Sequence, residues 1–524
     1  MPVTPTYPGV YIEELPSGVH PLTGVATSIT AFVGFASRGP VNTPTTVQSV
    51  MEFGRVFGGL SPTSTMSYAV AQFFQNGGQN ALVVRAVGSG ATPAKATQPG
   101  PPASTAITLK AASEGAWGTQ LRMRIDHDTV DATRFNLSVQ DKATGVVEVL
   151  RNLPTGSALG ATLEAQSSLV RLDGAAPTTR PTAHGAVAAG ADPFADVTPA
   201  PVSPNFTAFA IGGNDGARTE ADLIPAAGTG MYAFERADLF NLLVIAPPDP
   251  ASSSGAGASL TATAKASAAA FALAHRAMFL VDPDPTWDDP ADITGGLDTY
   301  IASISSDQRR NAAMYFPYLR APDPLQGNAV MEYPPSGAVA GVMSRTDTAR
   351  GVWKAPAGMD AGLSGVQQLK VKLTDGENGI VNPLGVNCLR TFPAAGHVVW
   401  GARTLAGADR LASEWKYVPV RRTALFLEES LYRGTQWVVF EPNDEPLWAQ
   451  IRLNVGAFMH DLFRKGAFQG TTPREAYLVK CDAETTTQTD INNGVVNILV
   501  GFAPLKPAEF VIVQIQQLAG QIES

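Results

Sequence analysis

Two glycine-containing loops follow predicted strands and are the first candidates for phosphate chemistry. The loop Gly34–Gly39 has the glycine spacing of a phosphate-binding loop, but Pro40 and Val41 stand where Lys and Ser or Thr would be required. In the second loop, Gly88–Gly90, Pro93 replaces the third glycine of a dinucleotide-binding loop. The Pro- and Ala-rich residues that follow cannot begin the helix that such a site needs. Neither loop therefore predicts a nucleotide or cofactor site.

Histidine and cysteine could supply metal ligands or a nucleophile, but their spacing favours neither chemistry. Cys388 and His397 lack a third residue that would orient a catalytic pair, and Cys388 and Cys481 are interpreted as buried small side chains. Residues 375–379 resemble part of a calcium loop without its alternating Asp series, which favours a turn. No HExxH or other ligand spacing connects the six histidines, His20, His127, His184, His275, His397 and His460. We therefore predict no catalytic, cofactor or metal-binding residues and no enzyme activity.

Charge and composition exclude further classes of protein. The 524-residue chain has a net charge of -9 and no cluster of Lys and Arg, which argues against a nucleic-acid partner. No run of about 18 apolar residues occurs, so we expect no direct membrane insertion. The first residues do not resemble a signal peptide, which predicts synthesis in the cytoplasm. Only 16% of the residues are charged, and this indicates an exterior that partner subunits partly cover.

The elements that position these residues begin with an α/β core in two pieces, residues 28–87 and 231–336. Continuous apolar runs predict buried strands, and segments with helical periodicity lie between them. Such alternation indicates crossover connections and a mixed, largely parallel sheet. The predicted strands are 28–35, 81–87, 239–245, 277–281 and 312–316, and the predicted helices are 49–57, 64–75, 260–276 and 293–306.

Residues 88–230 interrupt this core with a different pattern. A Pro/Ala/Thr-rich stretch at 91–104 is typical of a linker, and 174–203 is predicted to be a surface loop. Between them, short alternating strands are predicted at 106–110, 121–125 and 134–139. The pattern indicates a β-rich, loop-rich insertion that faces outward.

A third module, α+β in character, is predicted over residues 337–505. Its best-defined helix is 444–466, with Pro446 in the first turn and Gly466 at the end of an apolar stripe. Further helices are predicted at 337–352 and 423–433, and strands at 436–440, 475–480 and 495–502. The predicted fold class is therefore multidomain, α/β and α+β, with extended terminal β-arms.

The two arms lie within residues 1–27 and 506–524, and neither has an adjacent strand in its own sequence. An extended strand must pair its N–H and C=O groups, and it does so most simply at the open edge of another sheet. The alternative is that both ends pair with the sheet of their own chain. The predicted subunit-contact residues are Val10, Tyr11, Ile12, Glu13, Glu14, Leu15, Phe510, Val511, Ile512, Val513, Gln514 and Ile515.

Several motifs resemble the tail sheath proteins of contractile phage tails and of phage-derived contractile injection systems. The similarity spans both ends and much of the middle, and only the Gly/Pro/Ala-rich part of the insertion lacks a matching pattern. The motifs are Tyr7–Glu14, Ala31–Gly34, Arg38–Asn42, Gly115–Gly118, Trp415–Arg422 and Trp437–Asn443.

The resemblance implies a structural subunit that stacks as hexameric rings into a helical tube around an inner tube. Contraction would drive the inner tube through a target envelope, and exchanged terminal strands would link the subunits. The implied partners are other copies of the chain, the inner tube protein, the baseplate and the terminator or cap proteins, in a phage tail or an injection particle. The C-terminal module would lie nearest the inner tube, with possible contacts at Arg421, Arg422, Glu428, Glu429 and Arg433.

A competing interpretation is a monomeric α/β binding protein or hydrolase whose termini dock on its own sheet. Electron microscopy separates the two, because only a sheath subunit should form hollow tubes or stacks of rings. The sequence leaves open whether the particle is a phage tail, a bacteriocin-like device or an injection system.

Overall fold

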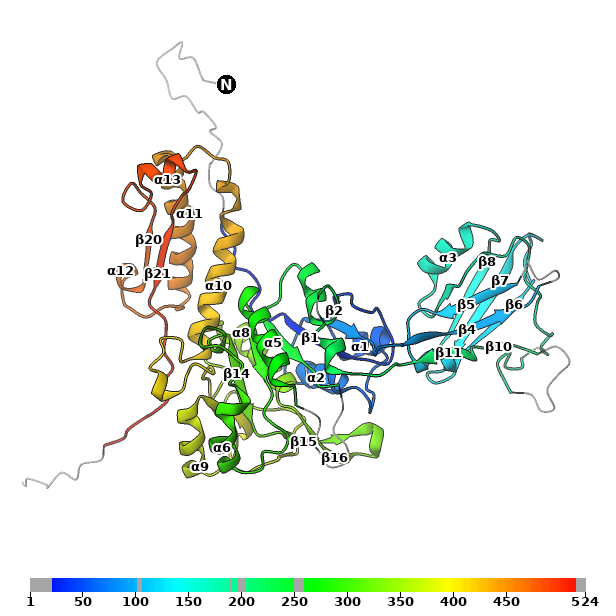
Figure 1. Ribbon diagram of the computed structural model, residues 1–524, viewed down its shortest axis with the longest axis horizontal. Coiled ribbons are helices and arrows are strands. Elements are labelled where there is room, and N and C mark those ends of the chain that lie inside the picture. The colour runs from blue at the N-terminus through cyan, green and yellow to red at the C-terminus, as the bar shows by residue number, and fades with distance from the viewer. Residues whose placement is uncertain are drawn as a thin grey trace, which may run out of the picture.

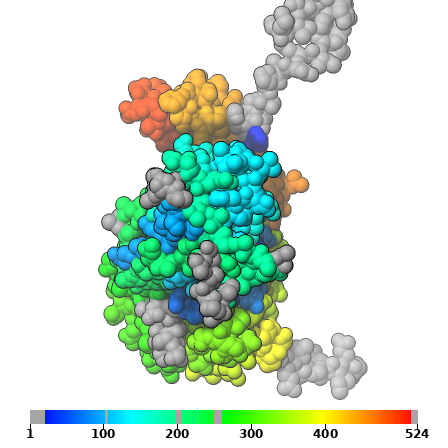
Figure 2. All heavy atoms as spheres, turned by 90° about the vertical axis from the view of Figure 1, so that its right-hand side faces the viewer, coloured from blue at the N-terminus to red at the C-terminus, as the bar shows by residue number. Residues whose placement is uncertain are grey.

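The computed structural model describes residues 21–100, 106–188, 190–196, 204–225, 227–248 and 259–514. Figure 1 shows three parts in a row: a β-sandwich at one end, a central α/β body, and a helix-rich C-terminal module at the other end. Figure 2 views the molecule from the sandwich end, so that the sandwich lies in front of the body. The mixed α/β architecture predicted from the sequence is confirmed.

An eight-stranded sheet forms the centre of the body. Its order is β19-β18-β14-β13-β12-β1-β3-β2. The strands from β18 to β3 run parallel, whereas β19 and β2 are antiparallel to their neighbours. The bounds are β1 (Thr30–Phe35), β2 (Thr45–Val47), β3 (Ala81–Ala86), β12 (Leu242–Ile245), β13 (Met278–Val281), β14 (Ala312–Phe316), β18 (Val386–Phe392) and β19 (Gly396–Val399). All residues of β1 are buried, as expected for an apolar strand covered on both faces.

Helices cover both faces of this sheet. On one face, α2 and α8 pack closely: a Cβ on Gly337 of α8 would lie 2.4 Å from the carbonyl oxygen of Ala69 in α2. Glycine is therefore required where the two helices touch. The helices on this face are α1 (Val50–Phe57), α2 (Thr65–Gln75) and α8 (Ser336–Arg350), and those on the other are α5 (Ala262–Ala274) and α6 (Pro290–Tyr300). Smaller elements are α4 (Glu220–Leu223), α7 (Ser306–Arg309), α9 (Asp375–Val381), β15 (Leu319–Asp323), β16 (Ala329–Tyr333) and β17 (Gln368–Leu369).

The body continues past the boundary predicted at residue 336. α8 covers the central sheet, and β18 pairs in parallel with β14 so that Met314 lies opposite Val386. The module predicted over 337–505 is therefore divided. Its first part, up to β19, completes the sheet of the body, and the separate C-terminal module begins at Val418.

The sandwich consists of two four-stranded sheets, ordered β10-β6-β7-β8 and β11-β4-β5-β9. Leu109, Met123 and Leu137 are fully buried in the apolar core between the sheets. The linker predicted at 91–104 is wrong in part, because residues 92–98 alternate between exposed and buried and form β4. The elements are β4 (Thr92–Gln98), β5 (Ile107–Ala111), β6 (Leu121–Asp126), β7 (Phe135–Asp141), β8 (Val147–Leu153), α3 (Ala158–Gln166), β9 (Val170–Leu172), β10 (Thr207–Ala208) and β11 (Ile211–Asn214).

The C-terminal module is a hairpin of two long helices with a small sheet beside it. The apolar stripe predicted for the second helix is buried, including Ile451, Val455 and Met459. The strand predicted at 436–440 is wrong: Gln436–Val438 form a 3-10 turn, because these residues join two antiparallel helices. The elements are α10 (Val418–Gly434), α11 (Glu445–Arg464), α12 (Pro473–Ala476), β20 (Tyr477–Lys480), α13 (Gln488–Asn492) and β21 (Leu499–Phe502).

Candidate assembly site

The first described residues run along α10. The backbone N–H of Val25 donates to Ser430 Oγ at 3.2 Å, and the guanidinium of Arg422 donates to the carbonyl oxygen of Thr27 at 2.8 Å. Leu22 packs against Gly434 at the far end of the helix, where an added Cβ would meet its side chain at 2.2 Å. The N-terminal part of the chain therefore joins the molecule at the end of α10 that points away from the body. The predicted arm residues Val10–Leu15 lie outside the described residues.

The last described residues leave from the opposite end of the module. After β21, Gln469 donates its backbone N–H to Ala503 at 2.9 Å, and the chain then runs past Glu509. Phe510, Val511, Ile512 and Val513 follow with exposed fractions of 72% to 84%, and Figure 1 shows this segment leading away from the body. Within the described residues 510–514 no strand forms, and Ile515 lies outside them. An apolar, β-branched segment thus stands in solvent in the isolated chain.

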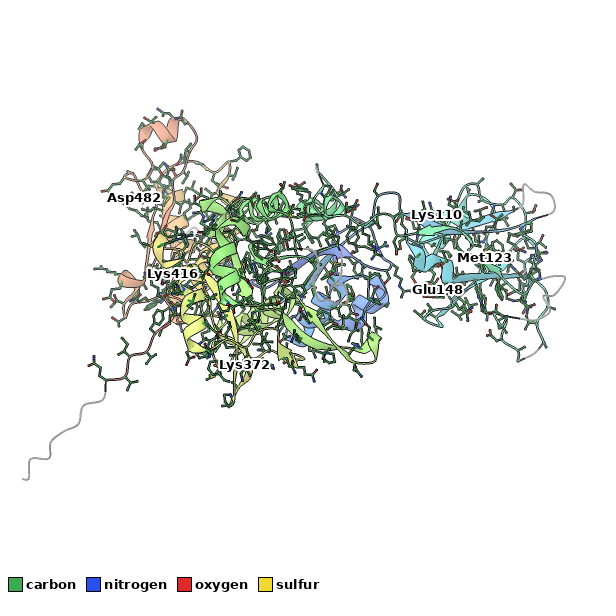
Figure 3. All side chains as sticks on the ribbon, turned by 60° about the horizontal axis from the view of Figure 1, so that its bottom comes forward. Lys110, Met123, Glu148, Lys372, Lys416 and Asp482 are labelled. Atoms are coloured by element: carbon green, nitrogen blue, oxygen red, sulfur yellow. The ribbon has the colours of Figure 1, made fainter. Side chains whose placement is uncertain are left out.

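Glu509 fixes the base of this segment on a fully buried arginine. Arg403 donates from Nε to Glu509 Oε1 at 2.6 Å and from Nη2 to Oε2 at 2.8 Å. The same carboxylate accepts from Asn382 Nδ2 at 2.7 Å and from the Tyr417 hydroxyl at 3.0 Å. Figure 3 labels Lys416, which lies beside this site where the module meets the body and pairs with Asp409 at 2.6 Å.

The charges in this anchor stabilise one another. Burial favours the neutral form of Glu509, but hydrogen bonds from Arg403 and Asn382 outweigh it and lower the pKa of the carboxyl. Burial also opposes the charge of Arg403, and the contact with Glu509 raises the pKa of the guanidinium despite it. A bidentate pair of this kind holds position as well as charge. The anchor therefore sets the point and direction from which residues 510–514 leave the body.

The module also contains an incomplete sheet. β20 and β21 pair in antiparallel register, with Val479 opposite Val500 and Lys480 opposite Leu499. Within the described part of the chain, this sheet has only these two strands. Leu478 and Leu499 are both more than half exposed. A two-stranded sheet is marginal by itself and presents edges to which further strands can add.

The predicted inner-tube contacts lie on α10, but most of them face inward. Arg421 and Arg422 are nearly fully buried, and so is Glu429. Arg422 forms a two-point ion pair with the buried Asp347 of α8, at 2.6 and 2.9 Å. Arg421 donates to Asn311 Oδ1 at 2.8 Å. The exposed charged face expected from the sequence is therefore wrong for these three residues, because each has a partner far away in the sequence.

Glu428 and Arg433 are the accessible members of the predicted set. Glu428 accepts from Arg421 Nη1 at 3.1 Å, and its side chain is 44% exposed. Arg433 pairs with Asp238 at 2.9 Å and with Glu429 at 2.7 Å. These two side chains are the part of the predicted contact surface that a partner can reach.

The residues considered for catalysis are buried, hydrogen-bonded or packed within the fold. Cys388 is fully buried in the core of the body, and burial raises the pKa of its thiol to about 12. The His397 ring bonds instead to Thr391 Oγ1 at 2.8 Å and to the carbonyl oxygen of Gln367 at 3.1 Å. Gly34 lies against Met66, where a Cβ would approach to 2.6 Å. These contacts give each of the three residues a structural role in the fold.

The described residues contain no cluster of three or more His, Cys, Asp or Glu side chains that could hold a metal ion. No helix in the described part of the chain is long and apolar enough to cross a membrane.

Sequence reasoning missed the anchor formed by Arg403 and Glu509. The two residues lie 106 positions apart, so no local spacing reveals the pair. The available signal was Glu509 itself, a single carboxylate immediately before the apolar run that begins at Phe510. A charge at that point indicates a fixed boundary between the body and the arm.

Comparisons with known proteins agree with this arrangement. Residues 412–517 match the family described as the phage tail sheath C-terminal domain. A curated relative, the tail sheath protein of Burkholderia phage BcepMu, is 28% identical over 180 residues. That match covers 34% of this chain and 37% of the relative's length.

Solved structures extend the similarity to nearly the whole chain. The anti-feeding prophage helical sheath in its contracted state is 23% identical with a TM-score of 0.54, over 98% of this chain and 100% of that one. The sheath complex of the extracellular contractile injection system PVC, also contracted, is 21% identical with a TM-score of 0.52, over 98% of both chains. At these identities the structural matches establish the fold. Together with the family match, they confirm the resemblance to contractile tail sheath proteins.

Proposed function

We propose that this chain, with its sheath fold and its phage tail sheath C-terminal domain, is a structural subunit of a contractile tube. Copies would stack as hexameric rings into a helical sheath around an inner tube protein. Contraction of the sheath would then drive the inner tube through a target envelope. The role is mechanical rather than catalytic, and the particle is a phage tail or a contractile injection system.

One observation carries this proposal. The same module contains both an exposed, extended segment and a small sheet with open edges. Residues 510–514 extend from the Glu509 anchor and pair with no strand in the described part of the chain, and the sheet of β20 and β21 lies in the same module. An arm from a neighbouring copy can add to this sheet through several backbone hydrogen bonds, each worth roughly 1 kcal/mol net. Repetition along a polymer multiplies this contribution.

The positions of the two ends support exchange in two directions. The N-terminal part joins the module at the far end of α10, whereas the C-terminal segment leaves beside the body. Arms that leave from opposite ends can connect one copy to two different neighbours. Such connections persist while folded bodies rotate and slide, so that the lattice stays continuous during contraction.

The energy for contraction needs no nucleotide in this proposal. An extended lattice is a trapped packing, and its conversion to a packing with more buried interface releases free energy. The baseplate and the terminator or cap proteins would hold or trigger this state at the two ends. Glu428 and Arg433 are the accessible charged groups that we propose for contact with the inner tube.

Electron microscopy of the expressed chain tests the proposal. We expect hollow tubes or stacked rings with six-fold symmetry. Removal of residues 1–16 should abolish ordered polymers and leave a folded body with a cooperative thermal transition. A monodisperse monomer that forms no polymer under any salt or concentration would contradict the proposal and favour a binding protein with self-docked termini.

A further inference from the structure

The loop that joins α10 and α11, residues 435–444, has an unusual aromatic residue near its middle. Phe440 is fully exposed at 102% and has a φ of 72°, and its neighbour Val439 is 63% exposed. A bulky side chain rarely adopts the left-handed region, because its Cβ is crowded there. Strained residues of this kind are concentrated at functional sites. The loop therefore presents an apolar ring to solvent at a conformational cost.

We call this loop the tip loop. Hydrogen bonds to its backbone and to Asn443 hold it in place. Asn443 accepts from the Trp448 indole N–H at 2.9 Å and donates to the carbonyl oxygen of Val495 at 2.9 Å. The backbone N–H of Glu441 donates to Val438 at 3.2 Å. Glu441 is exposed beside Phe440, and no ion pair with it occurs among the described residues. The tip loop thus displays an aromatic ring and a carboxylate on a fixed base.

A cleft of about 880 Å³ lies at the other end of the same module. It is bounded by Tyr417 before α10, by Lys465 after α11, and by residues 505–510. We call it the basal cleft. Trp353 and Trp400 contribute aromatic walls, and cationic side chains outnumber carboxylates on its lining: Arg350, Lys354, Arg390, Lys465 and Lys506 face only Asp375 and Glu509.

Several of these charges are uncompensated. Glu509 is already bound by Arg403, and Asp375 by Arg390. Arg350 and Lys506 have no ion pair within the described part of the chain. Burial, and then the charge of Arg350, lower the pKa of the Lys354 ammonium. An ammonium in this position gains from an incoming carboxylate. The basal cleft is therefore suited to a ligand that is both aromatic and acidic.

The tip loop and the basal cleft cannot meet within one molecule. α10 has 17 residues and begins at the cleft, so the tip loop lies about 25 Å away along the helix axis. Complementary surfaces at opposite ends of one rigid element generate a head-to-tail contact, which is the heterologous contact of a helical polymer.

We infer that the tip loop of one copy inserts into the basal cleft of a neighbouring copy. Phe440 packs against Trp353 and Trp400, and Glu441 pairs with Lys506, with Arg350 elsewhere on the cleft lining. This inference rests on the proposed polymer and adds to it a contact between side chains that is distinct from strand exchange.

Assembly of variants at constant salt tests this contact. We expect Phe440→Ala to raise the lowest concentration at which tubes form by at least about tenfold, as for a central aromatic contact. Val130→Ala, which removes a fully exposed side chain from the sandwich, should leave that concentration unchanged. Equal assembly of Phe440→Ala and the unaltered chain would overturn the inference and leave the proposed function standing. A wild-type chain that never polymerises would refute both.

Charge-reversal variants and cross-linking identify the residues that contact the tip loop. Glu441→Lys and Lys506→Glu should each weaken assembly, and the double variant should recover it. In tubes with a photo-cross-linking amino acid at position 440, peptides that contain Trp353, Trp400 or residues 505–509 should be captured from the neighbouring copy. Failure of the double variant to recover, or capture of other peptides only, would contradict the contact.

A final variant separates assembly from folding. Phe440→Gly removes the strain because glycine adopts positive φ freely. Below the concentration at which tubes form, its melting temperature should equal or exceed that of the unaltered chain, while its assembly is weakened as in Phe440→Ala. A parallel loss of folding stability and assembly would show that Phe440 serves its own fold and would overturn the inference.

Discussion

The β-sandwich and the C-terminal module lie at opposite ends of the molecule and use strands differently (Figure 1). In the sandwich, two four-stranded sheets face one another and bury the side chains between them. In the C-terminal module, the described residues form a two-stranded sheet beside a helical hairpin, with Leu478 and Leu499 more than half exposed. The sandwich covers the inner apolar faces of both its sheets within one chain, whereas the small sheet of the C-terminal module leaves Leu478 and Leu499 exposed.

The difference shows where assembly should be sought. A sheet whose apolar face is already covered gains only edge hydrogen bonds from an added strand, whereas a two-stranded sheet with exposed apolar residues gains both hydrogen bonds and burial. Exposed apolar residues occur in both regions, so exposure alone does not distinguish them: Val147 and Val149 are exposed on β8 of the sandwich. The exposed segment 510–514 and the two-stranded sheet are therefore the features on which we base the proposal that assembly contacts lie in the C-terminal module.

The strongest test of this comparison is to end the chain after Glu509. Removal of residues 510–524 deletes the exposed segment but keeps the anchor on Arg403, so the body should fold normally. We expect complete loss of tubes in electron microscopy and an unchanged thermal transition. As a matched control, Val147→Ser with Val149→Ser changes exposed apolar residues of the sandwich and should assemble normally. Tubes of normal length from the shortened chain would break the comparison.

The open module must also be held firmly on the body. Asp347→Ala removes the partner of the buried Arg422 and leaves its charge uncompensated between α8 and α10. Burial raises the pKa of the Asp347 carboxyl, and the charge of Arg422 opposes this shift. The charged form of Asp347 is therefore stabilised by its contact with Arg422. We expect a loss of about 3–5 kcal/mol in the free energy of unfolding, measured by urea denaturation.

A control for this variant removes the partner of another arginine on α10. Asp238→Ala breaks the pair with Arg433, in which the Asp238 side chain is 87% exposed. Because solvent screens that pair, we expect a loss below about 1 kcal/mol. Equal losses for the two variants would show that the buried pair does not fix the module to the body.

The sandwich should lose stability in mild acid. His184 is buried there, and its ring accepts the backbone N–H of Ile125 at 2.9 Å and contacts Thr207 Oγ1 at 2.9 Å. Burial, with a smaller effect of Arg124, lowers the pKa of His184 to about 4 from its usual 6.5. In this range the unfolded chain binds more protons than the folded one, so stability is present above pH 6.5 and is lost as the pH falls toward 4.

This shift corresponds to about 3 kcal/mol over the whole range. Hydrogen exchange of β6 and β10 should therefore accelerate between neutral pH and pH 4 more than exchange of α11. A His184→Gln variant should lose that difference in pH dependence. Faster acid exchange in α11 than in the sandwich would reverse the comparison.

Local patterns predicted the elements better than their partners. Apolar runs located the strands β1, β3 and β14, and the capped apolar stripe located α11 within two residues at each end. The apolar residues Trp437–Phe440 indicated a strand by propensity, but their position between two long helices makes them a turn.

Contacts between distant residues were not accessible to the same reasoning. Arg421 and Arg422 have the composition of a solvated helix face, yet each is buried because Asn311 or Asp347 is supplied from another element. Spacing within a sequence cannot show such pairs. The motifs for the sheath resemblance succeeded because they are local.

The smallest expected effect concerns the boundary between the closed body and the open arm. Glu509→Gln keeps the shape of the side chain and replaces a carboxylate that binds Arg403 through two hydrogen bonds. Asp409 still accepts from Arg403 at 3.0 Å, so the arginine is not left without an anionic partner. We expect a local cost of about 1–2 kcal/mol, seen as faster hydrogen exchange at residues 503–509 with no change in global unfolding.

The pH dependence of hydrogen exchange at residues 503–509 distinguishes a charged anchor at Glu509 from simple packing. Because the folded-state pKa of Glu509 lies below its usual 4.5, the stabilisation is complete above that pH and is lost as the pH falls through the lowered value. The unaltered chain should therefore release residues 503–509 in acid, whereas the Gln variant should exchange at a rate set by other groups. Glu428→Gln, which alters a half-exposed pair with Arg421, should behave like the unaltered chain. If both variants exchange alike, the terminal segment is held by its apolar contacts, and the charge at Glu509 does not define where the arm begins.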